Sequence, residues 1–179
     1  MLEVIIPARE LFDNDIQEFV NYSEQKLCLE HSLISISKWE EKWCVPFLSR
    51  QEKTDEEILD YIRCMTITKN VDKKVYEFIT KKNILEINQY INSPMTATTF
   101  SNNQSRPNRE IITSELIYYW MIAYNIPFEC QKWHLNRLLT LINICSIKNQ
   151  PPKKMSKSEI MSRNKSLNSA RRSAYHTKG

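Results

Sequence analysis

The sequence predicts a mainly α fold, in which a compact helical domain carries a small N-terminal β element and a basic C-terminal extension. The first observation is that 179 residues include a single glycine, Gly179. Glycine is common in the tightest hairpin turns, so its scarcity favours helices over many hairpins. The second is that apolar residues recur at helical spacing through most of the chain, and at a spacing of two only within the first forty residues.

Composition also limits the classes of function. Phosphate-binding loops and dinucleotide fingerprints need glycines where the backbone approaches the ligand, so a Rossmann site and a Walker-type P-loop are excluded. The chain is 41% hydrophobic and 26% charged, which suffices for a packed core. Because no apolar run approaches the length of a membrane span and no signal-peptide pattern begins the sequence, we expect a soluble, cytoplasmic protein without membrane contact.

Two short N-terminal segments are predicted strands. Residues 3–7 are rich in β-branched side chains, and residues 27–33 place leucines on one face. Together they predict a two-stranded sheet. For residues 13–20, between them, we expect a loop that leads into a helical turn.

Capping signals mark the starts of the predicted helices. Ser37 and Glu40 stand in capping-box relation, and Pro46 ends the helix that they begin. Thr54 and Glu57 repeat the signal for a second helix. A third is expected after Asp72. A fourth is expected to begin at Asn83 and to bury Ile84, Ile87 and Ile91.

The most apolar stretch lies further along. Residues 95–109 are rich in Thr, Ser and Asn and predict an exposed loop. Residues 113–124 are hydrophobic nearly all round, which predicts a central buried helix. A final core helix is expected at about 131–147. These elements make five or six core helices in a domain of residues 1–147.

The C-terminal extension, residues 148–179, differs in charge from the body. The net charge is +4, but from Ser146 onward nine basic residues stand against the single acid Glu159, which leaves the rest at −4. Ser156 and Glu159 predict a capped helix with few apolar residues, and such a helix orders only on a partner. The basic extension can bind nucleic acid, cover an acidic protein surface or remain solvated.

Candidate chemical sites have structural interpretations that we favour. Cys130 and His134 are four apart, as a thiolate and its base can be on a helix, but no orienting carboxylate is identifiable, so we expect His134 to bond a backbone carbonyl. The acids at 55–57 are expected in the first turn of a helix, with Asp60 on its wet face. Arg137 is expected to pair with Glu110, Glu115 or Glu129 inside the fold. The five scattered cysteines predict reduced thiols, and no catalytic residue, metal or cofactor is expected.

Four strings resemble a family of small proteins encoded in the tail-gene region of long-tailed bacteriophages. They are ISKWEEKWCVPFL at 36–48, PMTATTF at 94–100, REIITSELIYYWMI at 109–122 and IPFECQKWHLNRLLTL at 126–141. The similarity continues through 153–156, 163–164 and 167–171. It implies a tail assembly chaperone, which holds the tape-measure protein in the host cytoplasm while the tail is built and is often absent from the finished particle.

The expected mode of action is non-enzymatic protein binding. An amphipathic partner helix needs an apolar groove, and interface energy concentrates in aromatic and arginine side chains. The candidate partner-binding residues are Trp39, Trp43, Phe47, Lys153, Lys154, Lys157, Arg163, Arg171 and Arg172. Two alternatives stay open, namely a structural subunit of the tail or head–tail connector and a nucleic-acid-binding accessory protein. The oligomeric state is left open.

Overall fold

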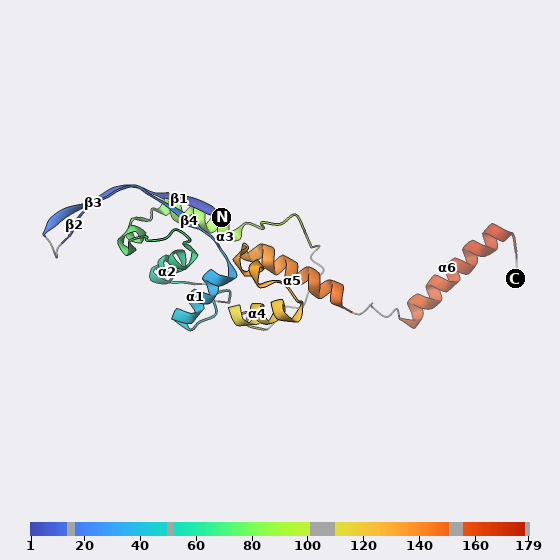
Figure 1. The fold of residues 1–179 in the computed structure, drawn as a ribbon. Coiled ribbons are helices and arrows are strands. Elements are labelled where there is room, and N and C mark those ends of the chain that lie inside the picture. The colour runs from blue at the N-terminus through green and yellow to red at the C-terminus, as the bar shows by residue number, and fades with distance from the viewer. Residues whose placement is uncertain (14–16, 50–51, 101–109, 151–155, 178–179) are drawn as a thin grey trace. The chain divides into compact units, whose positions relative to one another are not determined.

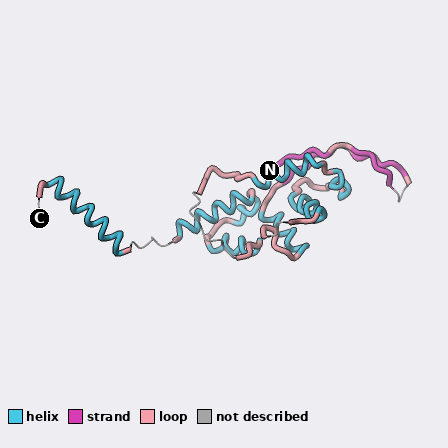
Figure 2. Tube along the Cα trace, turned by 180° about the vertical axis from the view of Figure 1, so that it is seen from behind, coloured by secondary structure: helices cyan, strands magenta, loops and turns pink. Residues whose placement is uncertain are grey.

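A computed structural model describes residues 1–13, 17–49, 52–100, 110–150 and 156–177. The chain divides into two compact units, Met1–Ser146 and Ile147–Gly179. Helices dominate and the strands are confined to the N-terminal residues (Figures 1 and 2). The expected fold class, mainly α with a small N-terminal β element, is confirmed.

The β element is a long two-stranded ribbon. Strand β1 (Leu2–Ile6) pairs antiparallel with β4 (Gln25–Leu29), and β2 (Arg9–Asp13) pairs with β3 (Glu18–Tyr22). Both ladders share one register, with Leu2 opposite Leu29 and Arg9 opposite Tyr22. The break between them falls at Pro7, which has no N–H to donate. In Figure 1 the β2–β3 end extends away from the helices of the first unit.

The ribbon confirms that two N-terminal strands pair, but the second strand ends at Leu29, and Leu33, which was expected in it, begins α1. The expectation for residues 13–20 is also corrected. A loop and a helical turn were expected there, whereas β2 and β3 form a hairpin. Gln17, which immediately precedes β3, adopts a left-handed φ of 53°. The alternation of side chains in Glu18–Tyr22 was the available signal.

Helix α1 (Leu33–Trp43) begins five residues earlier than the predicted cap at Ser37 indicated. Its N-cap is Ser32, whose side chain accepts from the Ser35 amide while the Ser35 hydroxyl accepts from the Ser32 amide. Glu40, which was expected to form a capping box with Ser37, bonds to distant segments instead. Its buried carboxylate accepts the amides of Phe47 and Ser114, each at 2.8 Å, and so links the segment after α1 to the start of α4.

The next helices follow their predicted starts closely. The capping box of Thr54 and Glu57 opens α2 (Asp55–Met65) as expected. Asp72 caps η1 (Lys73–Phe78), which is a 3₁₀ helix. Helix α3 (Lys81–Asn92) is capped by Thr80, and Asn83, the expected first residue, lies in its first turn. There the Asn83 side-chain amide donates to the Ile5 carbonyl at 3.2 Å, which fixes α3 against β1.

Helix α4 (Ser114–Ala123) is not the central buried helix that residues 113–124 predicted. It buries only Ser114, Ile117 and Met121. On the other side Tyr119 is 63% exposed and Ile122 61% exposed. The central place belongs to α1, whose Leu33, Ile36 and Trp39 are fully buried and which contacts α2, α4 and η2.

The last elements are η2 (Phe128–Lys132), α5 (Leu135–Asn149) and α6 (Lys157–Tyr175). Helix α5 starts at Leu135 and not at about 131, because the chain forms the separate 3₁₀ helix first. Helix α6 has the predicted capping box of Ser156 and Glu159, and none of its residues is buried. Within the described ranges, every helix is too short or too polar to cross a membrane.

Candidate functional site

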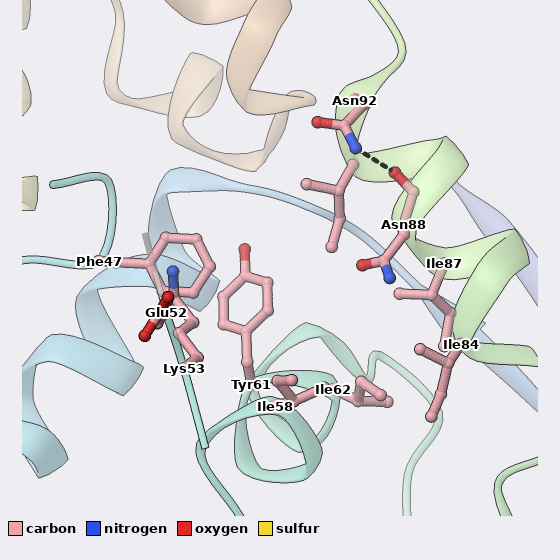
Figure 3. A pocket seen from close by; sticks show the side chains of 11 residues that line it. Phe47, Glu52, Lys53, Ile58, Tyr61, Ile62, Ile84, Ile87, Asn88 and Asn92 are labelled. Carbon is pink, nitrogen blue, oxygen red and sulfur yellow. Dashed lines mark hydrogen bonds between the residues drawn. The ribbon is translucent and has the colours of Figure 1, made fainter. Parts of the chain in front are cut away.

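An open groove lies between α2, α3 and the segment that follows α1. Its volume is about 680 Å³. Figure 3 shows isoleucines of α2 and α3 around the space, with the rings of Phe47 and Tyr61 beside them. The lining residues are Phe47, Glu52, Lys53, Ile58, Tyr61, Ile62, Ile84, Ile87, Asn88, Ile91 and Asn92. The groove therefore has an apolar floor and polar residues among its lining.

Helical periodicity places these side chains. Ile58 and Ile62 stand four apart on α2, and Ile84, Ile87 and Ile91 follow spacings of three and four on α3. Each helix thus turns one apolar stripe to the same space. Ile62 and Ile87 are buried, whereas Ile58, Ile84 and Ile91 are only half-buried.

The aromatic wall of the groove consists of two rings in contact. The rings of Phe47 and Tyr61 have centroids 4.1 Å apart, and the Lys53 ammonium lies 4.2 Å from the centroid of the Phe47 ring. Along α3 the Asn92 side-chain amide donates to the Asn88 carbonyl at 2.8 Å, as Figure 3 marks. An apolar ligand is accommodated by the floor, and Asn88 offers a polar contact from α3.

A buried histidine pair lies behind Tyr61. His31 Nδ1 shares a 2.5 Å hydrogen bond with the Tyr61 hydroxyl, and the His31 and His134 rings meet edge to face with centroids 5.1 Å apart. Desolvation by burial, with a smaller contribution from His134, lowers the pKa of His31 from 6.5 to about 3. Burial also lowers the pKa of His134. Both rings are therefore neutral near pH 7.

His134 has the structural role expected of it. Its Nε2 lies 3.0 Å from the Tyr90 carbonyl, and its Nδ1 accepts the Asn136 amide at 3.3 Å at the start of α5. Both ring nitrogens are thus occupied. Cys130 is buried in η2, before α5 begins. Cys130 and His134 therefore do not share a helical face, as a catalytic thiolate and its base would require.

Two of the aromatic candidates for partner binding lie in the core. Trp39 is 0% exposed and donates its indole N–H to the Glu57 carbonyl at 3.0 Å, and Phe47 is 8% exposed. Of the three aromatic candidates Trp39, Trp43 and Phe47, only Phe47 lines the groove. Trp43 is half-buried, stacks on Trp39 and donates to the Asp60 carboxylate at 2.9 Å. An exposed tryptophan anchor at Trp39 was the wrong interpretation, because α1 is the central helix.

The charged residues singled out from the sequence lie in different environments. Lys157, Arg163, Arg171 and Arg172 are exposed on α6. Lys153 and Lys154 lie outside the described residues. Asp60, expected on a wet face, is buried and accepts from Lys42 at 2.6 Å. Arg137, expected to pair with a glutamate inside the fold, is exposed, and its guanidinium lies 4.1 Å from the centroid of the Trp133 ring.

The groove isoleucines were predicted as core residues and not as site residues. Their spacing was recognised on each helix, but it gives no information on whether two stripes meet or leave a space between them. In the part of the chain that the structure describes, no three His, Cys, Asp or Glu side chains gather as a metal site would require.

Comparison of the chain with protein-family models, with curated proteins and with solved structures finds no match.

Proposed function

We propose that this chain is a non-enzymatic factor of phage tail morphogenesis, a chaperone that binds the tape-measure protein while the tail is assembled. The observation that carries the proposal is the open apolar groove between α2 and α3. The resemblance of four long strings to tail-gene proteins supplies the identity of the partner.

The groove has the properties that helix recognition requires. Amphipathic helices bind through apolar side chains at i, i+3 or i+4 and i+7, which enter a groove lined by apolar residues. Here Ile58, Ile84 and Ile91 are half-buried and remain available to such side chains. A long helical client with exposed apolar stripes would be protected from aggregation while those stripes are covered.

Helix α6 supports a second contact. It carries five basic residues and one acid, Glu159, and all of its described side chains are exposed. A basic helix of this kind attracts acidic segments from a distance and weakens its hold as ionic strength rises. Reversible binding suits a factor that leaves the client when the tail is complete.

Co-expression with the tape-measure protein of the same genome tests the proposal. The client is expected in the soluble fraction, and bound to this chain on size exclusion, only when this chain is present. A client that is equally soluble without it would refute the chaperone role. Proteomics of purified particles separates the structural alternative, since stoichiometric presence in virions would assign the chain to the tail or connector.

The charge of α6 also favours a nucleic-acid contact as the second candidate. Phosphate binding by Lys and Arg makes affinity fall steeply with salt. An electrophoretic mobility shift at physiological salt compares the full chain with the full chain carrying Arg171→Glu and Arg172→Glu. Binding that disappears with these charges would support this candidate, and equal or absent binding would dismiss it.

A further inference from the structure

Helix α4 presents an apolar face that is not used by the core. Glu115, Tyr119 and Ile122 follow spacings of four and three and lie opposite the buried Ile117 and Met121. Together with Phe128 and Glu129 of η2, they are named here the α4 face. Phe128 is 52% exposed and lies beside α4, since its ring centroid is 6.4 Å from that of Tyr118.

Two carboxylates belong to the α4 face. Glu115 and Glu129 are exposed, and the sequence has no basic residue from Glu110 to Gln131. A hollow of about 370 Å³ between α1 and α4 adds Glu41 to the Glu115 end, with Val45 and Pro46 among its lining. The face therefore consists of exposed apolar side chains flanked by carboxylates.

Helix α6 has the opposite arrangement. Lys157, Ile160, Asn164, Leu167 and Arg171 follow spacings of three and four along one face. Its apolar members stand between a basic residue at each end. A helix of 19 residues with so few apolar side chains is marginal in water, so it gains stability by packing on another surface.

We infer that the α4 face is the docking surface for helix α6 of a second copy of this chain. The α4 face carries exposed apolar side chains beside two carboxylates, and α6 carries exposed apolar side chains between two basic residues, so the two faces have opposite charge. Lys157 and Arg171 are 14 positions apart, and a rise of about 1.5 Å per residue separates them by about 21 Å along α6. That length exceeds the ten residues of α4, which span about 15 Å.

A reciprocal exchange of α6 between two copies makes a closed two-fold dimer. Each copy then contributes one α4 face and one α6, so the two contacts are identical. This inference stands apart from the proposed function, because it concerns the association of the chain with itself and needs no client.

Charge reversal in the full-length chain tests the inference. We expect the wild-type chain to show a monomer–dimer equilibrium in sedimentation velocity over a dilution series. Glu115→Lys with Glu129→Lys, or Lys157→Glu with Arg171→Glu, should weaken dimerisation by about tenfold or more, since like charges then face each other. All four substitutions in one chain should restore the dimer.

The matched control places the same change of charge elsewhere. Glu10→Lys with Glu77→Lys alters two exposed acids outside the α4 face and should leave the dimer intact. A wild-type chain that is monomeric at every concentration would overturn the inference, as would an α6 docked on its own chain, which gives no concentration dependence. A dimer that survives both reversals, or that the fourfold variant fails to restore, would also overturn it.

Discussion

The Tyr61 hydroxyl shares a 2.5 Å hydrogen bond with His31 Nδ1, while the ring of Tyr61 forms part of the groove wall. One side chain thus joins the candidate binding surface to a buried pair of neutral histidines. Behind this wall, His31 lies between β4 and α1, and His134 immediately precedes α5. The groove is consequently coupled to the stability of the core.

Acidification is expected to destabilise the fold through His31. Its pKa is lowered from 6.5 to about 3, so the unfolded chain takes up the proton first as the pH falls. Stability is therefore fully present above about pH 6.5 and is lost progressively toward pH 3. Between about pH 7 and about pH 5 the loss is about 2 kcal/mol.

Urea unfolding at the two pH values measures this loss. His31→Gln should flatten the dependence on pH, and His134 contributes with the same sign because its pKa is also lowered. His176 provides the control, since it is the exposed third histidine, and His176→Gln should keep the wild-type slope. Equal slopes for His31→Gln and the wild type would contradict the assignment.

Trp39 is expected to be a stability residue and not a contact residue. Trp39→Ala removes a fully buried ring and its hydrogen bond to Glu57, and should cost about 3–5 kcal/mol in the free energy of unfolding. Tyr119→Ala truncates an exposed aromatic side chain of α4 and should change the free energy of unfolding by less than about 0.5 kcal/mol. Guanidinium unfolding followed by circular dichroism compares the two. A Trp39→Ala variant as stable as Tyr119→Ala would show that α1 is not central.

The carboxylate of Glu40 is expected to hold α1 and α4 together. Glu40→Ala leaves the buried amides of Phe47 and Ser114 without their acceptor, which should cost about 2–5 kcal/mol. Its neighbour Glu41 is exposed, so Glu41→Ala should stay within about 0.5 kcal/mol of the wild type. Thermal unfolding of both variants decides the matter. Similar melting temperatures would contradict the bridging role.

Obstruction of the groove is expected to abolish the action on the client. Asn88→Arg places a long cationic side chain at the lining of the groove, whereas Gln89→Arg places the same side chain on the exposed residue beside it on α3, which does not line the groove. In co-expression, the first variant should leave the tape-measure protein insoluble and the second should act as the wild type. Unchanged solubility with Asn88→Arg would locate the client elsewhere.

Local signals predicted the helices well, and long-range packing explains the failures. Thr54 and Glu57 were identified because a capping box involves residues three apart. Ser32 and Ser35 form the same kind of box, but Glu40 was the stronger sequence signal and is engaged by amides of distant segments. Which acceptor a carboxylate finds depends on the tertiary fold.

Long-range packing also explains why the burial of α4 and the groove between α2 and α3 were not predicted. Residues 113–124 are apolar on nearly all sides, yet no neighbouring element covers Tyr119 and Ile122 in the described structure. The stripes of α2 and α3 were recognised separately, whereas the groove depends on the distance between the two helices. Periodicity identifies a face, but it gives no information on what lies opposite.

The shared register of the β ribbon has a consequence for length variation. Leu2 lies opposite Leu29 and Arg9 opposite Tyr22, so the pairing register is the same in both ladders. If the two strands gain or lose the same number of residues near the tip, every pairing at the base therefore stays unchanged. Paired insertions or deletions of two residues per strand also keep each side chain on its original face. The ribbon can thus lengthen or shorten at its tip without any adjustment of the helices at its base.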